Sequence, residues 1–549
     1  MITGAQAIVD CLKREGIDHV FGIPGTMNLP ILDVLRATPE IRFVLTRHEQ
    51  GAAFMAYGFA RTLHRPAVVT ATEGPGVTNL VTGIGAAYKG CVPVISISGA
   101  QELFVREKDA SQDIDQVTLH RSITKWAYSI PSVGKIQEAV RRAFRVALAE
   151  PLGPVHLDVS RDILMQQTEP EAIAPEAYRP ASLPACAAGE LDRSAELIAK
   201  AERPILLAGG GVLREGALAA LQRLAEATGI PVATLQYHPD AFPTSHPLSL
   251  GPLGRNGYSS ANRAMPQADV VVALGAHIDT FSTSFKYGII SKQSKLIHHS
   301  PVATDIGVVF PVAQAVAGST ASFIDGLTSR LAGKKWRWAD VAGLRRGWDV
   351  ERKKLLDPKR SPILPPVVAA AVREALPKDG IVIVDAGNAG KHMRVFMDTY
   401  QPDTYMYTDD WGSVGAAFPI AMGAKLAAEA AGGRGARRHG HDVQPRRAGD
   451  GGSRAHPGGV RGVQRLRPRQ RARLPERAVR RAHLRGRLRR RRLRRARPRA
   501  RLLRRTGHRP RGGPARGEAR TGQRPSRGRR CRHRQEHPRR GAAQGLARP

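Results

Sequence analysis

The last 116 residues of this sequence, 434–549, contain no Phe, Tyr, Trp, Ile, Met, Asn or Lys. A segment without aromatic residues, and with few branched apolar ones, cannot bury a hydrophobic core. The same segment holds 41 Arg against 5 acidic residues, a balance of +36 out of a formal net charge of +38 for the whole chain. Residues 1–433 are therefore close to neutral, and the basic character belongs to an Arg-rich tail.

Cysteine is scarce as well, with four residues at Cys11, Cys91, Cys186 and Cys531. Their spacing contains no CxxC or other metal-ligand pattern and suggests no disulfide framework. No uninterrupted apolar run approaches the ~18 residues that a membrane span requires, and residues 1–6 show neither a basic nor an apolar targeting region. These absences predict a cytoplasmic protein without a membrane partner.

Residues 1–433 alternate short apolar runs with helical patterns. Almost continuous apolar runs are typical of strands in a parallel sheet that helices cover on both faces. The length allows roughly three or four domains. We expect an α/β fold of three doubly wound parallel-sheet domains, the third truncated and followed by a disordered Arg-rich tail. The strands are expected at 20–23, 43–45, 67–71, 92–99, 154–159, 204–208, 232–234, 270–274, 296–299 and 381–385.

Changes in composition divide the chain into segments. The first domain covers 1–168, and a Pro- and Ala-rich stretch, 169–188, separates it from a second domain at 190–331. A third domain begins within 360–433, where Ser361 is a candidate helix cap, and the tail covers 434–549.

Three turns at predicted strand ends carry the candidate site. Glu49 enters a small-residue helix directly after the run 43–45, and a Glu in a first helical turn is ordinarily a capping and dipole residue. Pro24 and Gly25 form a turn before it, and Gly74 belongs to a Gly-Pro-Gly turn after it. Because ligands bind at the carboxyl ends of parallel strands, the three turns indicate one site.

These motifs resemble the thiamine-diphosphate enzymes of the acetolactate synthase and benzoylformate decarboxylase type. The resemblance rests on Phe-Gly-Ile-Pro-Gly at 21–25, Arg-His-Glu-Gln-Gly at 47–51 and Glu-Gly-Pro-Gly at 73–76, and it covers residues 1 to about 430. It implies a pyrimidine-binding first domain, a central domain and a diphosphate-binding third domain, in that order.

The resemblance implies that Glu49 is catalytic and holds N1′ of the cofactor's aminopyrimidine. A carboxylate that shares a proton with N1′ favours the imino form, whose exocyclic nitrogen then deprotonates C2 of the thiazolium. The implied reaction forms or cleaves a carbon–carbon bond next to the carbonyl of a 2-oxo acid such as pyruvate. Synthase (transferase), decarboxylase and lyase activities all stay open.

Further cofactor-binding residues follow from the same resemblance. It assigns Pro24, Gly25 and Gly74 to the pyrimidine side of thiamine diphosphate. Gly387 and Asn388, after the strand at 381–385, are assigned to the diphosphate.

A turn and a loop complete the implied site. Gly412 and Val414 match a turn that supports the cofactor, where Val414 would wedge between its two rings; plain core packing is the alternative. Gln112, in a segment that resembles the substrate-side loop, is implied to reach the reacting atoms; an exposed loop Gln is the alternative. The family pattern places a strand at 121–125 after this loop.

Two features of the central domain bear on whether it binds FAD. In acetolactate synthases this domain binds FAD, while relatives bind ADP or nothing. A Gly triplet at 209–211 follows a predicted strand, where backbone N–H groups can face a phosphate. The residues after Leu274 read Gly-Ala-His-Ile-Asp-Thr-Phe, which departs from the Arg-Phe-Asp-Asp pattern of the FAD enzymes and argues against FAD.

The metal site of the family is missing from the chain as written. The family holds Mg²⁺ through an Asp in a Gly-Asp-Gly turn and an Asn further on, both hard oxygen ligands. The literal Gly-Asp-Gly at 449–451 has no Asn anywhere downstream, so no metal ligand is assigned. The family also places its cofactor between two chains, which implies a homodimer or homotetramer.

The tail has the composition of a GC-rich gene read in a wrong frame, because the residue types it lacks have A- or T-rich codons. Read one nucleotide later, the codons for 460–471 permit Phe-Val-Val-Phe-Asn-Asp-Cys-Ala-Leu-Gly-Asn-Val, close to the family's strand and metal turn. We therefore expect a one-nucleotide frame change between about 423 and 438. Two alternatives stay open: a catalytically inactive relative, and an Arg-rich nucleic-acid-binding fusion that lacks the usual interleaved aromatics.

Overall fold

The computed structural model describes residues 1–280, 282–283, 288–338, 340–407 and 411–433. The Arg-rich tail and the Gly-Asp-Gly sequence at 449–451 lie outside the described residues. All described residues belong to the first of two compact units of the chain, Met1–Arg446. Among them, none of the helices is both long enough and apolar enough to cross a membrane.

The first sheet has six strands, all parallel, in the order β3-β2-β4-β5-β7-β6. Every residue of β4, β5 and β7, three of its four inner strands, is buried, because helices cover both faces, and this explains their continuous apolar sequences. The strands are β2 (His19–Gly22), β3 (Arg42–Leu45), β4 (Ala67–Ala71), β5 (Val94–Ala100), β6 (Trp126–Ser129) and β7 (Val155–Ser160).

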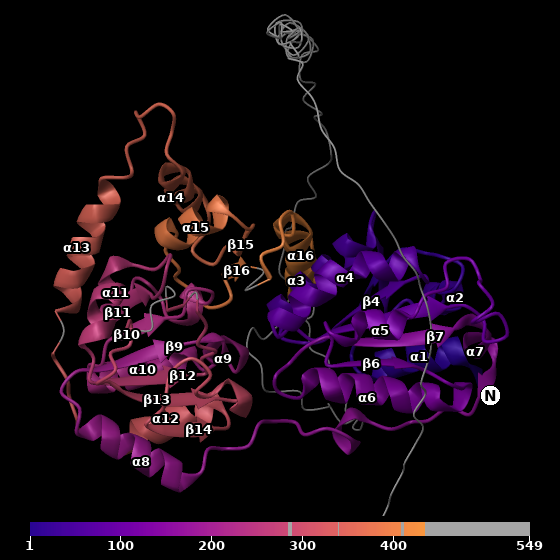
Figure 1. Cartoon of the computed structure of the whole chain (residues 1–549), viewed down its shortest axis with the longest axis horizontal. Helices are drawn as coiled ribbons and strands as arrows, with labels where there is room; N and C mark the ends of the chain where they lie inside the picture. Colours follow the sequence, from indigo (N-terminus) through magenta and orange to yellow (C-terminus); the bar gives the residue numbers. More distant parts are fainter. Residues whose placement is uncertain (281, 284–287, 339, 408–410, 434–549) are drawn as a thin grey trace, which may run out of the picture. The chain divides into compact units, whose positions relative to one another are not determined.

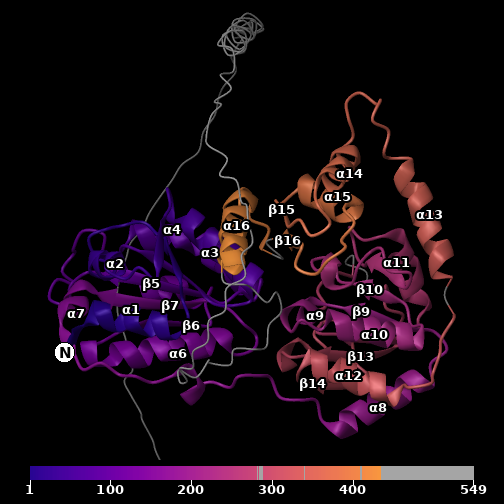
Figure 2. The ribbon, with the colours of Figure 1, turned by 180° about the vertical axis from the view of Figure 1, so that it is seen from behind.

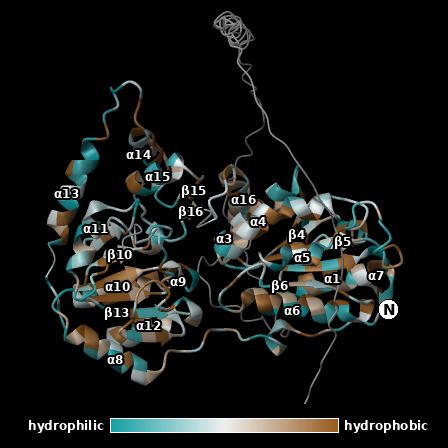
Figure 3. Cartoon of the chain, viewed as in Figure 1, coloured by the Kyte–Doolittle hydropathy of each residue, from teal (hydrophilic) through white to brown (hydrophobic). Residues whose placement is uncertain are grey.

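Two groups of helices cover this sheet (Figure 1). Val68 of β4 packs against the first group and its neighbour Val69 against the second, as side chains on opposite faces of a strand must. Along α6 of the first group, brown and teal patches alternate in Figure 3, since only one face meets the core. The first group is α1 (Gly4–Arg14), α2 (Leu29–Arg36), α6 (Ile136–Leu148) and α7 (Arg161–Met165); the second is α3 (Glu49–Leu63) and α4 (Pro75–Lys89).

The chain after β7 is fastened to the first domain. Strand β1 (Ile2–Thr3) pairs antiparallel with β8 (Gln167–Thr168). In the stretch expected as a linker, Tyr178 and Arg179 both bind the carboxylate of Glu15 at the end of α1.

The second sheet also has six parallel strands, in the order β11-β10-β9-β12-β13-β14. Its strands are β9 (Pro204–Ala208), β10 (Val232–Thr234), β11 (Ser249–Pro252), β12 (Val270–Leu274), β13 (Lys295–Ser300) and β14 (Gln314–Ala317). Helices α8 (Ala188–Ala199), α9 (Gly210–Arg214), α10 (Leu218–Thr228) and α12 (Thr320–Arg330) cover one face, and α11 (Ser259–Ala264) and α13 (Val341–Lys353) the other.

A third group of elements follows α13. Strands β15 (Val382–Val384) and β16 (Tyr405–Tyr407) pair in parallel beside α14 (Pro365–Ala375) and α15 (Asn388–Phe396). The last described helix, α16 (Ala417–Gly433), packs against α3. The expected α/β architecture with parallel sheets is confirmed.

Two local expectations were wrong. The segment 121–125 is not a strand, because α5 (Gln116–Arg121) occupies its start and the strand β6 begins only at Trp126. Asp115 caps that helix by accepting a 2.8 Å hydrogen bond from the Thr118 amide. Ser361 does not cap α14, whose first residue is Pro365; the fixed φ of proline suits that position and needs no amide partner.

Helices α3 and α16 cross at two glycines. A Cβ at Gly58 would lie 2.1 Å from the carbonyl oxygen of Ile420, and a Cβ at Gly423 would lie 2.0 Å from that of Met55. The two helices lie side by side in both views of the chain (Figures 1 and 2). The absence of side chains at these two positions therefore sets how closely the helices approach.

Candidate cofactor-binding site

The turns after β2 and β4 touch each other at the carboxyl edge of the first sheet. A Cβ at Gly25 would lie 2.3 Å from the Cβ of Thr72, so only a glycine fits there. The Gly25 amide donates a 2.8 Å hydrogen bond to the side chain of Asn28, which is buried and also donates to Thr70 at 3.3 Å. The turn at Pro24 and Gly25 is thereby fixed to the strand that leads to Gly74.

Glu49 is the first residue of α3 but not its cap. The cap is His48, whose Nδ1 accepts a 3.2 Å hydrogen bond from the Gln50 amide. The Oε2 of Glu49 instead accepts a 3.0 Å hydrogen bond from Asn79 of α4, and its Oε1 lies 3.5 Å from where a Cβ of Gly76 would be. The carboxylate thus faces the first turn of α4, and the ordinary capping interpretation does not apply.

The turn between β4 and α4 needs glycine at its centre. Gly74 has φ 54° and ψ −110°, a conformation that side chains disfavour. A Cβ there would lie 2.4 Å from the carbonyl oxygen of Gln112. The Gly74 amide donates a 3.1 Å hydrogen bond to the side chain of Gln116.

Gln112 contacts the Gly74 turn through its backbone carbonyl. Its own φ is 66°, and its side chain is exposed. The loop that carries it is closed by a 2.7 Å hydrogen bond from the Gln101 side chain to the Ser111 carbonyl. The structure therefore brings Gln112 to the edge of Gly74 without burying its carboxamide.

The residues assigned to the diphosphate lie at the start of α15. Gly387 is the N-cap residue, with φ 86°, and Asn388 is exposed in the first turn. The first amides of a helix have no partner within the helix and attract anions. The carboxylate of Asp385 accepts hydrogen bonds from the amides of Ala386 at 2.9 Å and Gly415 at 2.9 Å, which ties this turn to the segment that follows β16.

Val414 is 83% exposed among the described residues, so plain core packing does not explain it. Gly412 and Gly415 flank it with φ of 63° and 82°. The indole of Trp411 packs on α4, where a Cβ of Gly85 would lie 2.5 Å from the ring. The turn that carries Val414 is therefore held beside the helix that Gly74 introduces.

The predicted residues form two groups. Pro24, Gly25, Glu49, Gly74 and the backbone of Gln112 meet at the edge of the first sheet, and Gly387, Asn388, Gly412 and Val414 meet around Asp385. Packing of α16 on α3 links the groups, as does a 3.3 Å hydrogen bond from the Tyr57 hydroxyl to the Tyr407 carbonyl. Among the described residues, no cluster of three or more His, Cys, Asp or Glu could hold a metal ion.

The glycine turn of the central domain is closed by a histidine. A Cβ at Gly210 would lie 2.7 Å from Nε2 of His238. His238 is partly buried, and the loss of solvent around its ring holds its pKa well below the ordinary value, so the ring is neutral at physiological pH. The imidazole of His238 therefore lies directly against Gly210, the first residue of α9.

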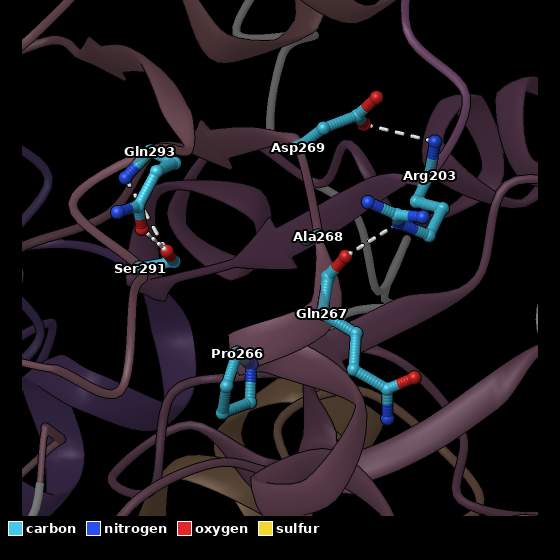
Figure 4. Close-up of a pocket in the computed structure, with 7 residues that line it drawn as sticks. All are labelled: Arg203, Pro266, Gln267, Ala268, Asp269, Ser291 and Gln293. Atoms are coloured by element: carbon cyan, nitrogen blue, oxygen red, sulfur yellow. Dashed lines mark hydrogen bonds between the residues drawn. The ribbon is translucent and has the colours of Figure 1, made fainter.

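A hollow of about 300 Å³ lies at the amino edge of the central sheet, opposite the glycine turn (Figure 4). Asp269 accepts hydrogen bonds from the amides of Glu202 at 2.7 Å and Arg203 at 2.8 Å. The guanidinium of Arg203 donates to the Gln267 carbonyl at 2.8 Å. These polar groups form hydrogen bonds with one another and connect the segments that lead into β9 and β12. We therefore interpret their role as structural.

Sequence reasoning missed four residues around the Gly74 turn: Asn79, Gln116, Asp158 and Arg106. Asp158 and Arg106 form an ion pair of 3.1 Å, and burial raises the pKa of the Asp158 carboxyl. A carboxylate inside the apolar run 154–159 was a usable signal, since buried charges need partners. Gln116 carried no such signal, because its partners come from β5, β7 and the turn after β4.

Comparisons with known proteins identify the family of this chain. Residues 2–119 match the model of the thiamine pyrophosphate enzyme N-terminal TPP binding domain, and residues 191–327 match that of the thiamine pyrophosphate enzyme central domain. The probable acetolactate synthase large subunit of Methanocaldococcus jannaschii is 33% identical over 439 residues, which cover 77% of this chain and 73% of that protein.

Two further relatives show the range of the family. The acetolactate synthase isozyme 1 large subunit of Escherichia coli is 33% identical over 427 residues, covering 77% of this chain and 75% of that protein. The sulfoacetaldehyde acetyltransferase of Castellaniella defragrans is 30% identical over 453 residues, covering 78% and 75%. The chain therefore belongs to the thiamine pyrophosphate enzyme family, among relatives of the acetolactate synthase large-subunit type.

Proposed function

We propose that this chain descends from an enzyme that forms or cleaves a carbon–carbon bond of a 2-oxo acid such as pyruvate with thiamine diphosphate, in the manner of an acetolactate synthase. One observation carries the proposal: the carboxylate of Glu49 is held by Asn79 at 3.0 Å directly beside the Gly74 turn. A carboxylate in that position is what activation of an aminopyrimidine requires.

The described residues fit the aminopyrimidine end of the cofactor. When bound, thiamine diphosphate supplies an acidic thiazolium carbon that can add to a carbonyl. Oε2 of Glu49 already accepts a hydrogen bond from Asn79. We therefore assign to Oε1 the role of sharing a proton with the ring nitrogen N1′ of the pyrimidine. Pro24, Gly25 and Gly74 provide backbone surface for the ring.

The other end of the cofactor is assigned to the second group of residues. The amides after Gly387, with Asn388, would hold the diphosphate, and Gly412 would let Val414 reach between the two rings. Gln112 would act on the substrate side. The exposed position of Val414 supports a role outside the core.

The proposed domains follow these roles. Residues 1–168 form the pyrimidine-binding domain, 190–331 the central domain, and 360–433 the start of the diphosphate-binding domain. Support comes from the two parallel sheets and from the β15 and β16 pair with its helices. We assign no FAD to the central domain, because the residues after Leu274 depart from the pattern of the FAD enzymes.

The names of the relatives favour a transferase. Acetolactate synthases and a sulfoacetaldehyde acetyltransferase are among them. A lyase or decarboxylase activity of the same cofactor is the alternative. We further propose that the enzyme acts in the cytoplasm as a homodimer or homotetramer, and that Mg²⁺ carries the diphosphate.

We also propose that the chain as written is impaired. The segment 434–549 has no Asn and only two Asp, at 442 and 450, so the family's pair of magnesium ligands is not present in it. A one-nucleotide frame change between about 423 and 438 accounts for its composition and for the loss of these ligands. The printed polypeptide is then an inactive form of a working enzyme.

The test compares two proteins in one assay of pyruvate consumption with thiamine diphosphate and Mg²⁺. The chain as printed should show no cofactor-dependent turnover, while the chain translated in the restored frame should show turnover that E49Q removes. Turnover by the printed chain would refute the impairment. A fully active E49Q variant of the restored chain would refute the role of Glu49.

The balance of +36 in 434–549 favours one other function, binding of nucleic acid through phosphate contacts. That function predicts affinity for RNA or DNA that falls steeply with salt and disappears when 434–549 are deleted. Equal binding by the deleted chain would exclude it.

A further inference from the structure

Gln116 joins the ends of three strands beneath the candidate site. Its side chain is only 3% exposed. Its Oε1 accepts a 3.1 Å hydrogen bond from the amide of Gly74, after β4, while its Nε2 donates to the Gly99 carbonyl of β5 at 3.2 Å and to Asp158 of β7 at 2.7 Å. One carboxamide thus satisfies three polar groups that burial would otherwise leave unpaired.

The same network reaches the loop that carries Gln112. The second carboxylate oxygen of Asp158 accepts a 3.1 Å hydrogen bond from Arg106, which belongs to that loop. Arg106 also donates to the hydroxyl of Ser129, at the end of β6, at 3.1 Å. The loop is therefore anchored through Asp158 to the residue that holds Gly74.

Gly74 and Gln112 are in direct contact as well. The carbonyl of Gln112 lies so close to Gly74 that an added Cβ would stand 2.4 Å from it. A movement of the loop and a movement of the turn are thus sterically coupled. Gln116 is the side chain that bonds to the turn and, through Asp158, to the loop.

We propose that Gln116 is a positioning residue that fixes the Gly74 turn and the loop of Gln112 as one unit. The consequence for catalysis rests on the proposed function, in which this turn borders the cofactor. Because Asn79 lies one turn into the helix that Gly74 introduces, a displaced turn would also shift the partner of Glu49.

The chemistry of the carboxamide explains the residue type. The position needs an acceptor toward the Gly74 amide and donors toward an anionic carboxylate and a carbonyl. A glutamate at this position has the same shape and still accepts the hydrogen bond from the Gly74 amide. When it is ionised, however, it has no proton to donate to Asp158 or to the Gly99 carbonyl. When protonated, it can donate to one of them.

The charged groups around Gln116 are few. Asp158 faces it from β7 with Arg106 as its counter-ion. The Nδ1 of His120 donates a 3.0 Å hydrogen bond to the Gln116 carbonyl, and His156 stacks on His120 with ring centroids 3.9 Å apart. Burial lowers the pKa of both histidines, so they are neutral at physiological pH. A Q116E variant therefore introduces one new titrating group into a site with a single ion pair.

The test measures hydrogen exchange, as protection factors, in the full-length chain at pH 5 and pH 8. For Q116E we expect a small loss of protection of the Gly74 segment at pH 5, where burial beside Asp158 keeps the new carboxyl protonated and able to donate to one acceptor, and a loss of about tenfold or more at pH 8. For Q116L we expect the loss at both pH values. The control is Q137E, since Gln137 is an equally buried glutamine of the same domain that bonds to the backbone of Glu169 and Glu171, far from Gly74 in sequence.

A second variant keeps the proposal testable if the Gln116 variants do not fold. R106M cuts the anchor of the loop at a partly exposed position and leaves Gln116 in place. For R106M we expect faster hydrogen exchange in residues 101–115. We also expect the exchange rate of the Gly74 segment to increase, but by less than that of the loop. Wild-type protection of Gly74 in Q116L, or a Q116E variant that follows the wild type at both pH values, overturns the proposal, as does an R106M effect confined to the loop.

A parallel titration with thiamine diphosphate separates this inference from the proposed function. If the wild-type chain binds the cofactor, the Kd of Q116E should rise with pH in step with the loss of protection. A Kd that stays constant while protection falls would show a purely structural role and overturn the proposal. No binding by wild type in either reading frame would refute the proposed function, and exchange alone would then decide the coupling.

Discussion

The side-chain amide of Asn79 donates a 3.0 Å hydrogen bond to the carboxylate of Glu49. This contact joins the first turn of α3 to the second turn of α4, two helices that start at the same edge of one sheet. Because Oε2 of Glu49 accepts this hydrogen bond, Oε1 is the carboxylate oxygen that stays available for a ligand. The position of the acid relative to the Gly74 turn is therefore set by a second helix and not by the loop before Glu49.

The first prediction concerns the role of Glu49 itself. In the frame-restored enzyme, E49Q should lower cofactor-dependent turnover by roughly 10²- to 10⁴-fold, because a carboxamide cannot share a proton with the ring nitrogen. The measurement is steady-state consumption of pyruvate at saturating cofactor. E40Q is the control, since Glu40 is an exposed partner of Lys13; equal loss in both variants would contradict the assignment.

The second prediction isolates the contact between Gly74 and Gln112. G74A and G16A both place a Cβ on a residue with positive φ, at 54° and 73°. No described atom lies within 4 Å of the added Cβ at Gly16, whereas at Gly74 the Gln112 carbonyl is 2.4 Å away. We expect G74A to cost about 1–3 kcal/mol more in the free energy of unfolding. If chemical denaturation gave the same loss of unfolding free energy for G74A and G16A, the loop that carries Gln112 would move away from the added Cβ without an energetic cost.

The third prediction concerns the crossing of α3 and α16. G58A should destabilise the fold by about 1–3 kcal/mol, because its Cβ would overlap the Ile420 carbonyl. G51A, in the same helix with no described atom within 4 Å of its Cβ, should stabilise it by about 0.5–1 kcal/mol. Opposite signs in thermal unfolding are expected. A neutral G58A would mean that α16 does not rest on α3 in solution.

The fourth prediction is a pH dependence. Burial, and then the nearby Asp403 carboxylate, raise the pKa of Asp240 from 3.8 to about 7, against the effect of Arg61. Between these values the folded chain holds a proton that the unfolded chain has released, so the contribution of Asp240 to stability falls as pH rises from about 4 to about 7.

D240N should remove this contribution. Its amide keeps an oxygen to accept from the backbone amides of Thr404 and Tyr405. We expect the variant to gain stability over wild type as the pH is raised from 5 to 8, measured by denaturation at each pH. D33N, at an exposed ion pair with Arg36, should show no such trend. A constant difference between D240N and wild type would contradict the shifted pKa.

Sequence alone was sufficient where the pattern is local. Strands β4, β9, β10 and β12 begin and end at the predicted residues, because buried parallel strands are continuous apolar runs bounded by turn residues. Strands β11 (Ser249–Pro252) and β14 (Gln314–Ala317) were not predicted. They lie at the edges of the sheet and their short sequences mix polar, glycine and alanine residues, which give no clear apolar run.

The site was predicted in part for the same reason. Motifs that stand together in the chain, such as the turns at Gly25 and Gly74, were found at the sheet edge where strand ends meet. Gln116 was missed because its three partners come from the turn after β4, from β5 and from β7, and no spacing in the sequence reports that convergence. The expected strand at 121–125 failed because the cap formed by Asp115 was not recognised.

The most direct measurement is the nucleotide sequence of the gene across codons 420–445. The account predicts one missing or extra base there, after which the restored frame supplies an Asp and, further on, an Asn as magnesium ligands of the diphosphate-binding domain. An unchanged frame would contradict it. The Arg-rich tail would then be a genuine part of a chain that lacks these ligands.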